Sequence, residues 1–301
     1  MKLDLQKVRE FGNIELLARQ LVEGFITGLH KSPYHGFSVE FAEHKPYNTG
    51  ESIRNIDWKV YARTDRLFVK QYEEETNLRC NILIDNSSSM YYPSGNFGKI
   101  TFSITAAATL AYLLQRQRDA IGFCTFSDKI ELQTPIKSTG SHLHKIFLSL
   151  EKMLSVKHPP KKTSIPEVLH QIASTVHKRS LIIIFSDMFD NEEKAGEIIA
   201  ALHHLKHNHH EVLLFHVTEK NTEIDFNFSD RPHEFIDMET REKIKISPPQ
   251  VRDQYKQHVQ NYVQELKVRC GQFKIDFIEA DIFHPVDKIL LSYLIKRKKM
   301  R

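Results

Sequence analysis

The feature that most constrains this chain is an apolar run that ends in an acid and is followed by hydroxyl residues at alternate positions. Residues 81–89 have the sequence NILIDNSSS. The apolar residues predict a buried strand, and such a strand in an open α/β sheet carries Asp85 to the carboxyl edge, where ligands bind. Ser87 and Ser89 then lie on the loop before the next helix, with both hydroxyls on the side of the carboxylate. These oxygens suit a hard cation such as Mg²⁺.

Two later segments supply further oxygen donors for the same site. The most apolar run, residues 181–185, continues into Ser186 and Asp187, so a second acid is expected at the same sheet edge. Thr163 precedes a helix predicted over residues 164–177, where its hydroxyl either caps the helix or faces the metal. With so few carboxylates the ion's charge stays largely unneutralised, and the site can bind a carboxylate of another molecule.

From residue 79 onward the sequence alternates between strand and helix patterns. Strands separated by helices imply right-handed crossovers and a parallel sheet. We therefore predict an α/β, Rossmann-like fold with a mostly parallel central sheet covered by helices on both faces. The predicted strands are residues 81–85, 120–126, 129–132, 181–185, 212–216 and 273–278, with a β excursion near 235–238; the predicted helices are residues 99–118, 141–153, 164–177, 191–207, 250–270 and 285–296.

The first part of the chain has a different pattern. Residues 4–30 carry apolar side chains at helical spacing, which predicts one or two amphipathic helices. Residues 36–76 are polar, aromatic and interrupted by glycine, which indicates irregular or antiparallel β structure. We expect an N-terminal helical and β extension over residues 1–78 and the α/β domain over residues 79–301.

Composition limits the class of protein. The chain has 301 residues, of which 41% are hydrophobic and 27% charged, enough for one large domain or two smaller ones. Its 3 cysteines have no C-x-x-C spacing, which argues against a disulfide framework or a thiolate metal site. No apolar stretch is long enough to span a bilayer. With a mild net charge of +4, we expect a cytoplasmic protein that neither binds nucleic acid nor inserts into a membrane.

The candidate ligands resemble a known metal site. Asp85-x-Ser87-x-Ser89, then Thr163, then Ser186-Asp187 is similar to the metal-ion-dependent adhesion site (MIDAS) of von Willebrand factor type A (vWA) domains. The resemblance covers roughly residues 79–296. It implies a vWA-like fold in which Mg²⁺, or else Mn²⁺ or Ca²⁺, is contacted directly or through water by Asp85, Ser87, Ser89, Thr163 and Asp187.

A second resemblance points to one particular family among the proteins that carry vWA domains. Residues 47–59, with the sequence YNTGESIRNIDWK, together with residues 62–64 and 73–75, resemble the signature of the bacterial family called domain of unknown function 58. Membership implies a MoxR-type AAA+ ATPase partner and a role in assembly or maturation of other proteins. The chain departs from the pattern in two ways: Lys161 and Lys162 precede Thr163 where vWA domains often have glycine, and the membrane helices of many members are absent.

Two other groups of residues have alternative interpretations. Arg54, Asp57, Trp58 and Arg63 form either a partner-binding patch or an internal ion-pair network, which sequence alone does not distinguish. A histidine cluster at residues 203–210 has the spacing of a helical zinc site, but it lacks the glutamate of an H-E-x-x-H motif, and we interpret it as solvated and structural.

Three functions are compatible with the sequence. The first is a non-catalytic binding module whose metal captures an acidic side chain of a client protein. The second is a metal-dependent phosphohydrolase with Asp85 as nucleophile, but such chemistry needs a second acid at the position of Ser87. The third is a metal-free vWA scaffold, because the ammonium groups of Lys161 and Lys162 would weaken metal binding if they pointed toward the site. No P-loop or Ser-His-Asp arrangement stands out, so we expect a protein that is not an enzyme.

Overall fold

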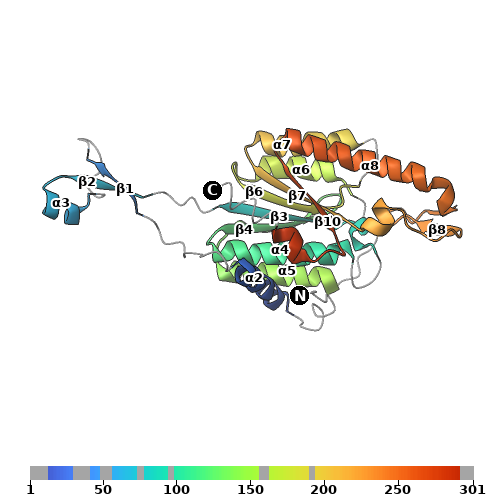
Figure 1. Cartoon of the computed structure of the whole chain (residues 1–301), viewed down its shortest axis with the longest axis horizontal. Helices are drawn as coiled ribbons and strands as arrows, with labels where there is room; N and C mark the ends of the chain where they lie inside the picture. The colour runs from blue at the N-terminus through green and yellow to red at the C-terminus, as the bar shows by residue number, and fades with distance from the viewer. Residues whose placement is uncertain are drawn as a thin grey trace. The chain divides into compact units, whose positions relative to one another are not determined.

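The computed structural model describes residues 13–29, 41–47, 56–72, 78–93, 98–155, 163–189 and 194–291 (Figure 1). The chain divides into two compact units. The larger comprises Met1–Thr27 and Leu78–Arg301, and the smaller comprises Gly28–Asn77.

The larger unit is built on a six-stranded sheet with the order β10-β7-β6-β3-β4-β5. Every neighbouring pair is parallel except β4 and β5, which are antiparallel. The prediction of a mostly parallel central sheet is confirmed. The strands are β3 (Arg79–Asp85), β4 (Ala120–Phe126), β5 (Ile130–Gln133), β6 (Leu181–Ser186), β7 (Glu211–Thr218) and β10 (Asp276–Asp281).

Helices cover both faces of this sheet, as predicted (Figure 1). Successive side chains of a strand point to opposite faces, so each strand contributes to two cores. In β3, Ile82 and Ile84 pack in one core and Leu83 in the other. The first core is covered by α2 (Ile14–Leu29), α4 (Lys99–Arg116) and α5 (Gly140–Ser155), and the second by α6 (Ile165–Thr175), α7 (Ala195–His207) and α8 (Pro248–Gln272). This architecture is consistent with a vWA-like Rossmann fold.

The region after β7 differs in detail from the prediction. The single β excursion is an antiparallel hairpin of β8 (His233–Ile236) and β9 (Lys243–Ile246), preceded by a π-helical turn, η4 (Lys220–Ile224). Strand β10 begins three residues later than the predicted 273, because α8 continues to Gln272 and Lys274 turns the chain with a φ of 56°. The last predicted helix is present over the described residues 286–291.

The N-terminal helix belongs with the sheet. Helix α2 buries Ile14, Leu17, Leu21 and Val22 in the first core, where they pack with residues of α4 and α5. The described part of Met1–Thr27 therefore groups with the larger unit, whereas we expected it to group with the β segment. The smaller unit pairs β1 (Phe41–Pro46) with β2 (Phe68–Tyr72) in an antiparallel sheet and includes α3 (Trp58–Thr64).

Two further observations concern the environment of the chain. In the part of the chain that the structure describes, no helix is both long and apolar enough to cross a membrane. The three cysteines are all free and buried. Burial raises the pKa of Cys124 and of Cys270 to about 12, so both thiols stay protonated at neutral pH.

The pairing of β3 and β4 depends on a residue without a side chain. Gly122 pairs with Asn81, and a Cβ atom there would lie 2.8 Å from Ile136 Cγ1 and 2.9 Å from Asn81 Oδ1. We predict that Gly122→Ala lowers the free energy of unfolding by about 1–3 kcal/mol, as overpacking typically does. Urea denaturation measures the loss. Gly196→Ala is the control because a Cβ there meets nothing within 4 Å, and equal stability of the two variants would contradict the prediction.

Candidate metal centre

The strand register places the first acid of the site beside β6. Ile84 pairs with Phe185, so Asp85 at the end of β3 lies level with Ser186 at the end of β6. Asp85 is fully buried, with 0% of its surface exposed. Its Oδ1 accepts a hydrogen bond from the backbone N of Ser87 (2.9 Å), and its Oδ2 accepts one from Ser186 Oγ (2.7 Å). Both carboxylate oxygens are therefore held in place.

The two serine hydroxyls lie together beside this carboxylate. Ser87 Oγ and Ser89 Oγ are 3.0 Å apart, where the chain enters a short 3-10 helix, η2 (Ser88–Tyr91). Alternate spacing thus brings both hydroxyls into contact, as the sequence pattern predicts.

The second acid, Asp187, directly follows β6 and is also fully buried. Its Oδ1 accepts a hydrogen bond from Phe189 N (3.2 Å), and its Oδ2 accepts one from Lys99 Nζ (2.7 Å). Burial, followed by the charge of Asp187, raises the pKa of Asp85 to about 7. The two carboxylates are thus close enough to repel each other.

A buried lysine partly neutralises this charge. Lys99 is the first residue of α4, and 0% of its side chain is exposed. Its Nζ lies 2.7 Å from Asp187 Oδ2 and 2.5 Å from Glu223 Oε1 in η4. Burial alone would lower the pKa of Lys99, but the two carboxylates outweigh it and raise the pKa to about 12. The side chain is therefore an ammonium at neutral pH.

Thr163 faces a third acid and does not cap the helix that follows. The N-cap of α6 is Ser164. The alternative of Thr163 as a helix cap is therefore wrong. Its hydroxyl donates to Glu239 Oε1 (3.0 Å), and its backbone N donates to Glu239 Oε2 (3.3 Å). Burial raises the pKa of Glu239, and the charge of Asp187 adds to this rise, so this carboxylate also lies near the second acid of the site.

The donors fit a hard divalent cation. The five candidate ligands offer two carboxylates and three hydroxyls, all oxygen. Among the described residues no three His, Cys, Asp or Glu side chains gather as a metal-binding group, so hydroxyl oxygens must complete any shell. The raised pKa of buried Asp85 marks negative charge that a nearby cation would stabilise.

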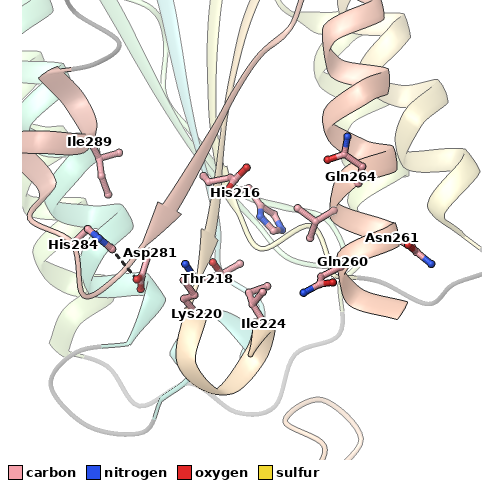
Figure 2. Close-up of a pocket in the computed structure, with 12 residues that line it drawn as sticks. His216, Thr218, Lys220, Ile224, Gln260, Asn261, Gln264, Asp281, His284 and Ile289 are labelled. Atoms are coloured by element: carbon pink, nitrogen blue, oxygen red, sulfur yellow. Dashed lines mark hydrogen bonds and ion pairs between the residues drawn. The ribbon is translucent and has the colours of Figure 1, made fainter. Parts of the chain in front are cut away.

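A cleft lies at the same end of the sheet and adjoins the site through His216, which pairs with Ser186 and contacts Asp187. It has a volume of about 650 Å³ and is lined by residues of α8 and by the ends of β7 and β10. Figure 2 shows Gln260 and Gln264 of α8 on one side of it, with His216 between the helix and the strands. Burial lowers the pKa of His216 to about 4, so its ring is neutral at neutral pH. None of the five candidate ligands lines the cleft.

The patch predicted from the family signature is only partly described, because Arg54 lies outside the described residues. The same holds for Lys161 and Lys162, which precede Thr163. Asp57 Oδ1 accepts from Lys59 N (3.0 Å) and from Val60 N (3.3 Å), so its carboxylate caps α3. Trp58 is 60% exposed. Arg63, in the last turn of α3, is exposed as well, so both side chains are accessible in the smaller unit.

The histidine cluster makes local contacts. His204 Nδ1 lies 2.9 Å from His170 Nδ1, and the ring of His203 packs on Phe273 with centroids 4.7 Å apart. No third histidine or acid joins them as a metal-binding group among the described residues.

Sequence reasoning missed three charged residues of the site: Lys99, Glu223 and Glu239. Lys99 could have been noticed because it begins the helix that follows the serine loop. The two glutamates lie between β7 and α8, in a segment whose pattern indicates only a β excursion. Their contacts reach residues 124 and 76 positions away.

The comparisons with known proteins give remote relatives. The uncharacterized protein Rv1480 of Mycobacterium tuberculosis is 24% identical over 140 residues, which are 46% of this chain and 44% of that protein. The chain thus matches less than half the length of this curated relative.

Two solved structures illustrate the likeness to known structures. An aerotolerance-related membrane protein from Bacteroides fragilis has 15% identity and a TM-score of 0.46, covering 73% of this chain and 99% of that one. Proximal thread matrix protein 1 from the mussel byssus, with a zinc-occupied MIDAS motif, has 16% identity and a TM-score of 0.36, covering 47% of this chain and 38% of that one.

The family model gives a broader match. The model described as "Protein of unknown function DUF58" matches residues 43–265, well over half of the chain. It spans most of the N-terminal β segment and most of the α/β unit, including all five candidate ligands. The chain therefore belongs to the DUF58 family.

Proposed function

We propose that this DUF58 protein is a non-catalytic, metal-dependent protein-binding module. In this proposal the ion is Mg²⁺, with Mn²⁺ or Ca²⁺ as alternatives, and its protein ligands are Asp85, Ser87, Ser89, Thr163 and Asp187. The observation that supports the proposal is that two buried acids, Asp85 at the end of β3 and Asp187 after β6, lie close together at the carboxyl edge of one sheet, with the hydroxyls of Ser87 and Ser89 beside Asp85.

The protein's own residues prepare the site for an ion. Ser186 and the backbone of Ser87 fix the carboxylate of Asp85, while Lys99 and the backbone of Phe189 fix that of Asp187. Ligands held by such outer contacts pay little ordering entropy when the ion binds. When bound, the ion supplies a strong positive charge at which a client's carboxylate can complete the coordination shell.

The setting of Asp85 supports a binding role over nucleophilic catalysis. Ser87 stands where phosphohydrolase chemistry needs a second acid.

We further propose that the module acts in the cytoplasm with a MoxR-type AAA+ ATPase, in the assembly or maturation of other proteins. Family membership supports the partner through the resemblance described above. Three free, buried cysteines are compatible with a reducing compartment. Exposed Trp58 and Arg63 of the smaller unit are candidate partner contacts.

Calorimetric titration of Mg²⁺ or Mn²⁺ tests the metal site. We expect saturable binding by the wild type and none by Asp85→Ala, because that variant loses a carboxylate ligand. Asp253→Ala is the control, since it removes an exposed carboxylate of α8 and should bind like the wild type. If none of the three proteins gave a heat of binding, the metal hypothesis would be contradicted.

Lys99→Met tests how the lysine and the ion share the charge of the site. Without metal, the variant leaves Asp187 and Glu223 without their ammonium, and we expect a loss of about 3–5 kcal/mol in unfolding free energy. Because Mg²⁺ can replace the lost positive charge, it should raise the Tm of the variant more than that of the wild type. Thermal melts in MgCl₂ and in NaCl of equal ionic strength measure this, and equal Mg²⁺ shifts would refute the prediction.

Affinity capture of the ATPase tests the partner. Wild-type protein should retain a MoxR-type AAA+ ATPase in Mg²⁺, and Asp85→Ala or EDTA should release it if the metal forms the contact. Trp58→Ala tests the alternative contact surface, which lies in the smaller unit; loss of capture by this variant would assign the contact to that surface. Capture that is unaffected by Asp85→Ala and by EDTA would contradict a metal-mediated contact.

A further inference from the structure

The segment between β7 and α8 brings an acid of this same chain to the candidate metal centre. Glu239 lies in the turn between β8 and β9, 76 residues from Thr163 in sequence. Its two carboxylate oxygens accept from the hydroxyl (3.0 Å) and the backbone N (3.3 Å) of Thr163. One of the five candidate ligands therefore already contacts a carboxylate, but from within the molecule.

The turn is built so that Glu239 has a fixed position. Asp237 Oδ1 accepts from the backbone N of Glu239 (2.7 Å) and of Thr240 (2.8 Å). Arg241 adopts a φ of 65°, and its N donates to Asp237 O (3.0 Å). Asp237 is thus an Asx-type turn former that holds the next residues of the tip.

Aromatic side chains anchor the base of this hairpin. Phe235 of β8 stacks on Phe226 with ring centroids 5.7 Å apart, and Phe226 contacts Tyr255 of α8 at 4.5 Å. The Tyr255 hydroxyl donates to the backbone oxygen of Glu223 (3.0 Å). Because Glu223 binds Lys99, Tyr255 of α8 contacts both the aromatic base of the hairpin and the residue that holds the Lys99–Asp187 pair.

Geometry places the carboxylate of Glu239 where it can reach an ion. Both of its oxygens lie on Thr163, a candidate ligand, and the side chain is partly buried. Lys99 is already bound to Asp187 and Glu223. A divalent ion beside Thr163 would therefore stabilise the carboxylate of Glu239 in its observed place.

We propose that Glu239 is an internal ligand of the metal site, and that its carboxylate takes the place that the proposed function gives to a client's acid. The inference rests on that function and adds its regulation: the β8–β9 hairpin closes the site, and a client's carboxylate binds by displacing Glu239. The site then binds only those carboxylates that compete successfully with the tethered carboxylate of Glu239, and it excludes weakly binding ones.

Titration of the full chain with Mn²⁺, read by water proton relaxation, tests this. Glu239→Gln should weaken Mn²⁺ binding roughly tenfold, the scale of losing a group that completes a metal site. At saturation the variant should relax water protons faster than the wild type, because water occupies the position that Glu239 leaves. Glu242→Gln, which changes an exposed acid of the same turn, should behave like the wild type.

Sodium acetate then serves as the probe for a client's carboxylate. Acetate should displace the extra water from Mn²⁺-loaded Glu239→Gln and slow its proton relaxation, while the wild type resists the same acetate concentration. Mn²⁺ affinity, relaxation and acetate response equal to the wild type would overturn the internal ligand and leave the metal site standing. Absence of Mn²⁺ binding to the wild type would refute the site, and the inference with it.

Discussion

Two buried carboxylates that meet at the carboxyl edge of the sheet determine the arrangement around them. The register of β3 and β6 brings Asp85 level with Ser186, and Asp187 follows at once. Burial and mutual repulsion raise the pKa of Asp85 to about 7, so its ionised form is unfavourable there unless a cation lies nearby. Lys99 provides one positive charge at Asp187. The hydroxyls of Ser87 and Ser89 add neutral oxygens beside Asp85, which leaves a cation as the natural complement.

The segment between β7 and α8 joins this charge to the surface of the molecule. Glu223 reaches Lys99, and Glu239 reaches Thr163, from the same stretch of chain. The aromatic contacts of Phe226, Phe235 and Tyr255 fix that stretch on α8. The contacts of the two acids are therefore coupled to the hairpin. In the proposed function, a client that moves the hairpin would act on the candidate metal centre in return.

The strands and the two acids at their ends could be predicted because both depend on local sequence. Apolar runs 82–84 and 181–185 specify buried parallel strands, and the residues that follow, Asp85 in one case and Ser186-Asp187 in the other, fall at the ligand edge. The contacts of Lys99, Glu223 and Glu239 could not be predicted, because their partners are 76 or more positions away and nothing local encodes those pairs. The surface on which α2 packs could not be predicted for the same reason, since an amphipathic helix does not specify which surface it covers.

Diffraction from crystals grown with Mn²⁺, recorded at the manganese absorption edge, tests the metal site most directly. The account predicts an anomalous peak at bonding distance from oxygens of Asp85, Ser87 and Ser89, with the carboxylate of Glu239 in the same shell. Crystals with no peak at this edge of the sheet, in which Lys99 remains the cation beside Asp187, would contradict it.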